Sequence, residues 1–395
     1  MLLVLATGVA PLAGGSQAEA ARTASYALRN GLDSTPPLST GLLTAVSAAP
    51  GTSQAWAVGN GVGFMVCSGG YVLGYDGQSW SPVQSGLATD VALNGVAAVS
   101  ATQVWIVGGV YAKGYCDTRS RPFLADSSGG TFKAYNLTSL HLGDAVLDGI
   151  SADSSTNAWA VGYSLTKSSA SPVALQWSGT SWVQVPIPSQ LDSGQELASV
   201  SASSASNVWI IGVNPATDVT DLLHWDGTTW ASYPNPIAGQ SLGDVATSSS
   251  NQAWVISFGD ASAHWNGTAW TKVAVPKNIT LHGVTMSGTS AWAVGRGPVG
   301  QSGRAVPKAL YSTGGGWQEQ TVPDPSASKS SANQSSLYAV SAASGSFVAA
   351  VGQNGVECGT GQNSFGDLYN GSVWQSTGGP ADLPADRQVG PDCGG

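Results

Sequence analysis

Short hydrophobic segments recur along the chain, and polar turn signals separate them. The most regular segment alternates large and small residues and ends in Val-Gly, as in Ala55-Trp56-Ala57-Val58-Gly59. Alternation with a period of two is typical of a β-strand, and apolar residues on both faces predict a strand covered on both sides. Seven copies occur about 48 residues apart, anchored at Trp56, Trp105, Trp159, Trp209, Trp254, Trp292 and, in place of tryptophan, Phe347.

Two further elements accompany each anchor. A Leu-x-x-Val segment precedes it, starting at Leu43, Leu93, Leu147, Leu197, Leu242, Leu281 and Leu337. An aromatic-flanked turn follows it, as in Trp225-Asp226-Gly227 with Trp230. Asp-Gly and Asn-Gly pairs favour a type I′ hairpin turn, in which both central residues have a positive φ. These places in the repeat account for all 15 tryptophans, so the repeat extends over the whole array.

Each repeat therefore predicts four short antiparallel strands, and seven repeats predict an all-β, seven-bladed β-propeller. One four-stranded sheet cannot bury either apolar face alone, whereas a ring of sheets buries both. An open solenoid is the alternative, but it needs polar end caps, which neither end of the array resembles. We expect a signal peptide (1–20), an extension that is a candidate ring-closing strand (21–41), the propeller (42–378) and a tail (379–395).

The N-terminal segment has the features of a secretory signal. The apolar run from Leu2 to Ala13 is too short to span a bilayer, and Ala18-Glu19-Ala20 matches a cleavage signature. No basic residue precedes Arg22, so we expect the charged start of the signal to lie upstream or to be truncated. The alternative is a disordered apolar N-terminus. Export predicts a secreted or cell-surface protein, and no later stretch is apolar enough for a transmembrane segment.

Composition and charge narrow the class further. Glycine contributes 52 residues and charged residues only 9%, which is typical of a turn-rich all-β chain. A formal net charge of −9 argues against a nucleic-acid partner, because phosphate binding needs clustered Lys and Arg. The chain has no phosphate-binding loop motif and no Cys-x-x-Cys or His-x-x-x-His spacing. We therefore expect no metal site and no cofactor.

The acidic and histidine residues do not indicate an enzyme. Glycosidases need two facing carboxylates, but Asp76 and Asp226 stand beside turn glycines, where a structural role is expected. Only four Glu are present, and one of these lies in the leader. His224 and His264 hold equivalent repeat positions and so belong to separate blades. No catalytic residue is predicted.

The cysteines predict disulfides, because their number is even and export is expected. Cys67, Cys116 and Cys358 each follow their anchor by 11 residues, in three repeats that are neighbours in a closed ring, and Cys393 lies in the tail. We favour Cys67–Cys116 together with Cys358–Cys393. The alternatives are Cys67–Cys358, which would staple the ring shut, and four free thiols.

The repeat resembles the tryptophan-rich repeats of exported bacterial propellers, over about residues 42–378. It is also similar to the tectonin repeats of some lectins, where a Val-Trp strand precedes a Trp-Asp-Gly-Ser-x-Trp hairpin. The Asp-box of sialidase-like propellers is a more distant relative, because it has five steps from Asp to Trp where Asp226 and Trp230 have four. The likeness implies a propeller and, through the lectins, glycan binding, but it carries over no individual sugar-binding residue.

The loops between the second and third strands of each repeat are the candidate binding site, because variable loops on a rigid scaffold carry binding. Their aromatic and arginine residues suit sugar or protein surfaces. The candidates are Phe64, Tyr111, Tyr115, Arg119, Arg121, Arg296 and Arg304. We expect a binding module with a glycan or protein ligand; the alternatives are a polysaccharide hydrolase or lyase, and a structural part of an extracellular or envelope assembly.

Overall fold

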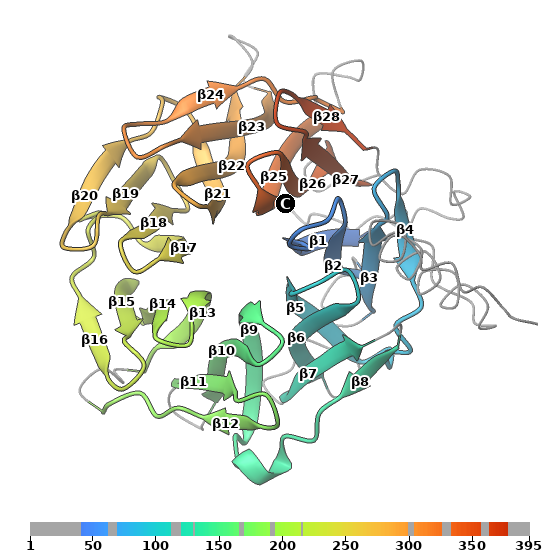
Figure 1. Ribbon diagram of the computed structural model, residues 1–395, viewed down its shortest axis with the longest axis vertical. Coiled ribbons are helices and arrows are strands. Elements are labelled where there is room, and N and C mark those ends of the chain that lie inside the picture. The colour runs from blue at the N-terminus through green and yellow to red at the C-terminus, as the bar shows by residue number, and fades with distance from the viewer. Residues whose placement is uncertain are drawn as a thin grey trace, which may run out of the picture.

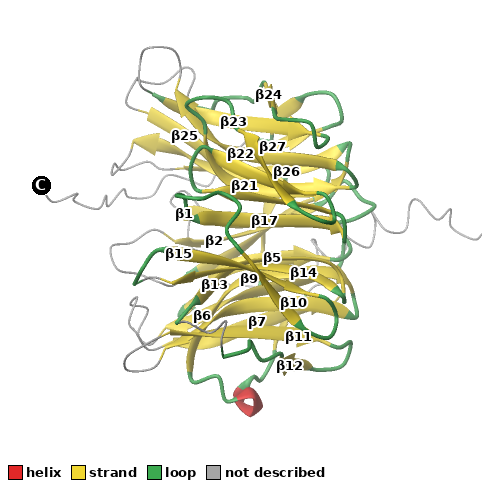
Figure 2. Cartoon of the chain, turned by 90° about the vertical axis from the view of Figure 1, so that its left-hand side faces the viewer, coloured by secondary structure: helices red, strands yellow, loops and turns green. Residues whose placement is uncertain are grey.

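A computed structural model of the protein shows a closed ring of seven four-stranded antiparallel β-sheets (Figure 1). It describes residues 41–61, 69–111, 120–128, 131–165, 170–189, 194–214, 216–298, 304–325, 333–356 and 363–377. Seen edge-on, the strands run from one face of the ring to the other (Figure 2). The predicted seven-bladed β-propeller is therefore confirmed.

Each blade takes four consecutive strands from one stretch of chain, with the first strand nearest the axis (Figure 1). The first strands of blades 1 to 7 are β1 (Gly41–Ala48), β5 (Val91–Ala98), β9 (Asp144–Ser154), β13 (Glu196–Ser204), β17 (Leu242–Ser249), β21 (Thr280–Ser287) and β25 (Asn333–Ser344). The second strands are β2 (Ala55–Gly61), β6 (Gln103–Tyr111), β10 (Asn157–Leu165), β14 (Asn207–Asn214), β18 (Gln252–Ser257), β22 (Ser290–Pro298) and β26 (Phe347–Val356). The third strands are β3 (Gly70–Tyr75), β7 (Ser120–Ser128), β11 (Ala170–Trp177), β15 (Val219–Trp225), β19 (Ala261–Trp265), β23 (Ala305–Ser312) and β27 (Asn363–Tyr369). The fourth strands are β4 (Trp80–Val83), β8 (Phe132–Ala134), β12 (Trp182–Gln184), β16 (Trp230–Tyr233), β20 (Trp270–Ala274), β24 (Gln318–Gln320) and β28 (Trp374–Ser376).

The second-strand tryptophans fill the gaps between blades, as the repeat predicts. The ring centroid of Trp105, in blade 2, lies 5.3 Å from those of Trp177 and Trp182 in blade 3. Trp209, in blade 4, is in the same way packed against the turn-flanking pair of blade 5. Trp105, Trp159, Trp209 and Trp254 are fully buried. Each such indole belongs to the core of two neighbouring blades, which explains why the blades form a ring.

The turn between the third and fourth strands differs from the expected type I′ hairpin. Tyr75 pairs with Trp80, so the loop between them has four residues. Only the glycine has a positive φ, 98° at Gly77, while Asp76 is absent from the residues with positive φ. The carboxylate of Asp76 accepts hydrogen bonds from the N–H groups of the third and fourth loop residues, each at 2.9 Å. The aspartate therefore acts as a side-chain acceptor that closes the loop.

The anchor position of blade 7 is filled by Ala349, not by Phe347 as expected from the sequence. Trp56 pairs with Ser47 in blade 1, and Ala349 pairs with the equivalent Ser341 in blade 7. Phe347 lies two residues earlier in the chain. The alternation of large and small residues around Phe347 imitates the repeat closely enough to misplace the alignment by two positions.

This realignment also changes the predicted cysteine pattern. Counted from Ala349, Cys358 stands two residues nearer to its anchor than the cysteines of the first two repeats stand to theirs. The structure tests none of the proposed pairings, because the four cysteines lie outside the described residues: Cys67, Cys116, Cys358 and Cys393. Residues 1–40 and 378–395, which contain the expected signal peptide, most of the extension and the tail, also lie outside them.

Hydroxyl groups of the first strands join successive blades. The hydroxyl oxygen of Ser47 accepts a hydrogen bond from the N–H of Ala98 in the next blade at 2.9 Å. Ser341 accepts one from Ala48 at 3.0 Å, which joins blade 7 to blade 1 and helps to close the ring. Equivalent bonds are those of Ser151 with Ala202, Ser201 with Thr247, and Thr285 with Ala342. Blades 2 and 5 have Ala97 and Ala246 at this position.

One buried carboxylate interrupts the apolar pattern between blades 6 and 7. Asp367 is fully buried, and neither of its carboxyl oxygens has a hydrogen-bond partner among the described residues. Strand register places Leu or Ala at the same position of the other six blades, namely Leu73, Ala125, Leu175, Leu223, Ala263 and Leu310. Alternation along β27 puts Asp367 on the same face as Phe365, which packs with Trp292 of blade 6. Burial and then the charge of Asp324 raise the pKa of Asp367 to about 8.

Within the described part of the chain, no helix is long and apolar enough to cross a membrane. The described helical structure is a 3-10 turn, Thr138–Leu140 (η2).

Candidate functional site

Every first strand carries a β-bulge at the residue after the leucine of its Leu-x-x-Val segment. In blade 1, Leu43 pairs with Gly59 and Ala45 with Val58, which leaves Thr44 without a cross-strand partner. The seven bulged residues are Thr44, Asn94, Asp148, Ala198, Gly243, His282 and Tyr338. A bulge turns its extra residue out of the regular alternation. All seven line the central channel.

The glycine that ends the Trp-Ala-Val-Gly strand makes room for the bulge. A Cβ on Gly162 would lie 2.0 Å from the carbonyl oxygen of Val146, and one on Gly352 would lie 2.0 Å from that of Ser336. No side chain fits at such a distance from backbone. In blades 1, 2, 3, 6 and 7 the Val-Gly ending is therefore a packing requirement of the bulge on the neighbouring strand. Blade 5 has Ser257 at this position, and its bulged residue is Gly243.

The central channel has a volume of about 430 Å³. We call the side where first strands begin and second strands end the loop face. Phe258, which is 64% exposed, also lines the channel and stands over Gly243, where an added Cβ would meet its ring at 2.6 Å. We call the ring formed by the seven bulged residues and Phe258 the channel mouth. Phe258 supplies the side chain that Gly243 lacks.

One side of the channel mouth is acidic and aromatic. Burial, and then the charge of Glu196 at the start of β13, raise the pKa of Asp148 to about 7. The amide of Asn94 donates a hydrogen bond of 3.1 Å to this carboxylate and partly opposes the rise. Burial and then the charges of Asp148 and Glu196 raise the pKa of Tyr163 to about 12, and burial and then Asp148 raise that of Tyr111. These effects place two carboxylates and two phenols close together across blades 2 to 4.

The opposite side of the channel mouth is basic and aromatic. The rings of His282 and Tyr338 lie 5.2 Å apart. Burial and then the charge of Arg296 lower the pKa of His282 to about 4, so the imidazole is neutral at physiological pH. Its Nε2 is buried and has no partner among the described residues. Two carboxylates therefore lie at or beside the channel mouth on blades 3 and 4, and the guanidinium of Arg296 lies beside it on blade 6.

A third carboxylate of the channel has a structural role. Asp244 accepts hydrogen bonds from the hydroxyl of Ser199 at 2.7 Å and from the N–H groups of Val245 and Val284, each at 2.9 Å. It thus links blades 4, 5 and 6. Burial raises its pKa to about 6 even though these bonds oppose the rise. No group of three His, Cys, Asp or Glu residues capable of holding a metal ion occurs in the described ranges.

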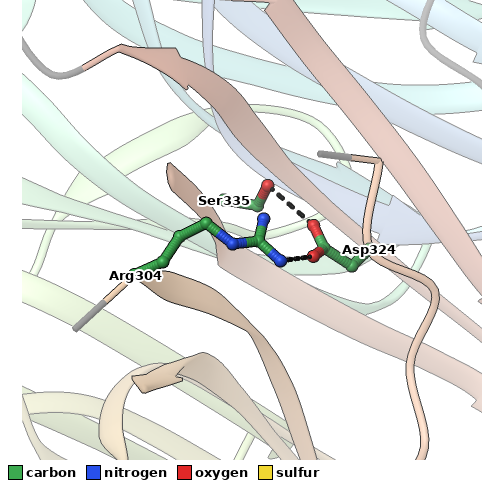
Figure 3. Close-up of polar contacts among 3 residues, drawn as sticks. All are labelled: Arg304, Asp324 and Ser335. Atoms are coloured by element: carbon green, nitrogen blue, oxygen red, sulfur yellow. Dashed lines mark hydrogen bonds and ion pairs between the residues drawn. The ribbon is translucent and has the colours of Figure 1, made fainter. Parts of the chain in front are cut away.

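Arg304, one of the loop candidates, is held in an internal network (Figure 3). Its guanidinium donates to Asp324 at 2.6 Å, and the hydroxyl of Ser335 donates to the other oxygen of the same carboxylate at 3.1 Å. The pair joins β23 of blade 6 to β25 of blade 7 through the connection between the blades. The structure therefore gives Arg304 a supporting position between blades.

The other predicted site residues divide into three groups. Tyr111 contributes to the acidic side of the channel mouth, and Arg296 lies on its basic side. Neither of these two residues lines the channel itself, and nor does Arg121, which is exposed on β7. Phe64, Tyr115 and Arg119 lie outside the described residues.

Sequence reasoning missed the bulged residues, although the repeat contains a signal for them. The position after each leucine carries seven different residue types, whereas Val or Ile stands two positions later in every repeat. A variable position inside an otherwise uniform strand is where a side chain is free of packing constraints. The sequence named Tyr111 and Arg296, whose role in binding stays a prediction, while Asp148, Glu196 and Tyr163 came only from the structure.

No known protein family and no curated protein sequence matches the chain. Solved β-propellers are similar to it in fold. The GH74 xyloglucanase from Xanthomonas campestris is 14% identical with a TM-score of 0.58, covering 88% of this chain and 55% of that one. YCF48 from Cyanidioschyzon merolae is 16% identical with a TM-score of 0.52, covering 81% and 95%. The six-bladed fucose-binding lectin of Aleuria aurantia is 14% identical with a TM-score of 0.46, covering 73% and 97%. At these identities the likeness to the xyloglucanase and to YCF48 shows the propeller fold alone.

Proposed function

We propose that this protein is a binding propeller, secreted or displayed at the cell surface, that holds a glycan or protein ligand at the channel mouth on its loop face. The observation that carries the proposal is the set of bulged residues. Seven equivalent backbone positions present seven different residue types to one channel, while the surrounding scaffold repeats. Chemical variety concentrated on a rigid frame is typical of a recognition surface.

The chemistry of the channel mouth suits a polar ligand with some apolar surface. Phe258 and Tyr338 offer aromatic faces and Asp148 is a polar group of the mouth, while Tyr163 and Glu196 stand beside Asp148. Ligand sites combine aromatic area with a few placed polar groups. The resemblance of the repeat to tectonin lectins supports a glycan among the two ligand classes.

The test uses one variant on each face of the ring. Phe258→Ala truncates an exposed ring of the channel mouth, and Val373→Ala truncates a 52% exposed side chain in the hairpin on the opposite face. Wild type and both variants are applied to a glycan array and used to capture cell-surface extracts. The proposal expects ligands that Phe258→Ala loses and Val373→Ala retains. Blank results on both screens, or equal loss in both variants, would contradict it.

Export belongs to the proposal and rests on the N-terminal sequence. Cell fractionation of the natural host should find the protein in the medium or at the surface, with a mature N-terminus near residue 21. Recovery in the cytoplasm with residues 1–20 attached would refute this part.

A second candidate function, polysaccharide hydrolysis, is favoured by one observation. Asp148 and Glu196 are electrostatically coupled carboxylates, and the pKa of Asp148 is raised to about 7, as a general acid requires. Reducing ends are measured after incubation of wild type and Asp148→Asn with soluble polysaccharides. Release by wild type that Asp148→Asn abolishes would establish hydrolysis; tight binding without release would favour the binding propeller.

A further inference from the structure

A second, smaller cavity lies between blades 6 and 7, beside the channel mouth. Its volume is about 60 Å³. It is lined by Arg296, Ala305, Gln334, Ser335, Ser336, Tyr338, Gln353, Asn354 and Gly355. Tyr338 lines both this cavity and the channel, so a ligand at the channel mouth passes next to it. At ~10–15 Å³ for each water-sized group, the cavity admits about four such groups, the size of a carboxylate with its attached carbon. We call it the interblade pocket.

Within the described part of the chain, the lining of the interblade pocket has one formal charge, which is the positive charge of Arg296. Arg296 forms no ion pair within the described ranges, where the ion pairs are Arg304 with Asp324 and Lys308 with Glu319. Among the described residues, no carboxylate lines the pocket. Asp324, which accepts a hydrogen bond from the lining residue Ser335, is already paired with Arg304. A guanidinium without an acidic partner is the group that binds a carboxylate best, because its N–H groups match both oxygens.

The pocket also needs a hydrogen-bond donor from outside. Asn354 is only 7% exposed, and its Oδ1 is buried with no partner in the described part of the chain. Buried amide oxygens are nearly always paired, so this atom is a ready acceptor for a ligand hydroxyl. The other described lining residues are the hydroxyl residues Ser335 and Ser336, the amides Gln334 and Gln353, the phenol of Tyr338, and the small apolar residues Ala305 and Gly355.

A carboxylate for Arg296 and a hydroxyl for Asn354, in a polar pocket, describe a sugar acid. We propose that the interblade pocket takes the carboxylate end of a uronic-acid unit in an acidic glycan, while the rest of that unit and its neighbours lie over the channel mouth. A peptide carboxylate would also satisfy Arg296, but its apolar side chains would find few partners on these walls, and the glycan is therefore the better fit. This inference rests on the proposed function and names its ligand class.

The test compares acidic and neutral sugars on matched variants. Calorimetric affinities are measured for trigalacturonate, for neutral galactotriose and for an acidic peptide with a free C-terminus. The proteins are wild type, Arg296→Gln, Phe258→Ala and the control Arg121→Gln. The control makes the same change of charge at an exposed arginine away from the pocket. Circular dichroism and thermal unfolding check that each variant is folded.

We expect trigalacturonate to bind at least about tenfold more tightly than galactotriose, and Arg296→Gln to remove this preference, because a hydrogen bond to a charged group is worth about that factor. Arg121→Gln should keep it. Equal binding of both sugars, or a preference for trigalacturonate that survives Arg296→Gln, would overturn the inference. In either case, loss of sugar binding in Phe258→Ala would still support the proposed function. Binding of the peptide through Arg296 instead would assign the pocket to a protein ligand. If neither sugar nor peptide binds, the inference falls; the proposed function falls only if the array and extract screens are blank as well.

Discussion

The variant Asp367→Asn removes a buried carboxyl group while keeping the shape of the side chain. In the folded protein the pKa of Asp367 is raised from 3.8 to about 8, first by burial and then by the charge of Asp324. Between these pH values the folded protein keeps the carboxyl protonated, while the unfolded chain ionises it. Unfolding then releases a proton, so the free energy of unfolding falls as pH rises from about 4 to about 8.

The size of the effect follows from the width of this pH window. Each pH unit between the unfolded and folded pKa values corresponds to ~1.4 kcal/mol. Relative to pH 4, ionisation of Asp367 in the unfolded chain therefore lowers the free energy of unfolding by ~4 kcal/mol at pH 7 and by ~6 kcal/mol above pH 8. Asparagine cannot ionise and should lack this loss. Asp367→Asn should therefore match wild type near pH 4 and exceed it by ~4 kcal/mol at pH 7, which is large against a typical total of about 5–15 kcal/mol.

Denaturant unfolding followed by tryptophan fluorescence at pH 4, 7 and 8.5 measures the difference directly. Asp226→Asn is the matched control. Hydrogen bonds from Thr228 and Thr229 lower the pKa of Asp226 in an exposed turn, so this variant should show no gain in stability as pH rises. A constant difference between wild type and Asp367→Asn at all three pH values would refute the reasoning. So would a variant that is less stable than wild type at pH 7, because the carboxylate would then be ionised and stabilising.

Three further predictions concern the ring itself. Trp209→Ala should lower the free energy of unfolding by ~3–5 kcal/mol in denaturant titrations, because it empties a fully buried space between two blades; a loss below ~1 kcal/mol would contradict the packing. Ser341→Ala should lower the free energy of unfolding by ~1 kcal/mol, because it removes a hydrogen bond that closes the ring. Ala97→Ser should raise the free energy of unfolding by a similar amount, because it adds the hydrogen bond that blade 2 lacks. If neither variant changes the free energy of unfolding, these hydroxyls do not stabilise the ring. Gly162→Ala should reduce soluble folded protein or the melting temperature sharply, because its Cβ would meet a carbonyl oxygen, whereas Gly315→Ala, which has open space around it, should not; equal melting temperatures would contradict the bulge argument.

The repeat was readable from the sequence because its energetics are local to each unit. The tryptophans are large and evenly spaced, and the same four-strand unit must bury them each time. Four strands per unit and seven units around a ring followed from that spacing. The exception is blade 7, where Ala349 fills the anchor position and the alternation around Phe347, two residues earlier, imitates the repeat.

The turn chemistry was predicted only in part. Asp-Gly or Asn-Gly correctly marked four of the seven hairpins and correctly placed a positive φ at the glycine, as at Gly227. The number of loop residues is decided by which aromatic residues pair across the strands, and Trp225 pairs with Trp230. That pairing leaves room for the side chain of Asp226 to accept two backbone N–H groups, which a type I′ turn would not need.

The candidate site depended on tertiary structure to a greater degree. The sequence indicated the loop face, and with it Tyr111 and Arg296. The residues of the channel mouth are separated by tens of residues in the chain, and each sits in an apolar strand that predicts burial. Only the bulge turns them toward the axis, and only closure of the ring brings Asp148 next to Glu196 or His282 next to Tyr338.

The sequence thus determined the four-stranded blade, because large aromatic and small residues at fixed spacing are buried when such blades pack face to face. Tertiary structure decided what the axis presents and what lies between blades, including the interblade pocket and the buried Asp367. The physical reason is that pKa values, unpaired polar atoms and cavities arise from groups on different blades, whose distances are set by the closed ring and by no single segment of the chain.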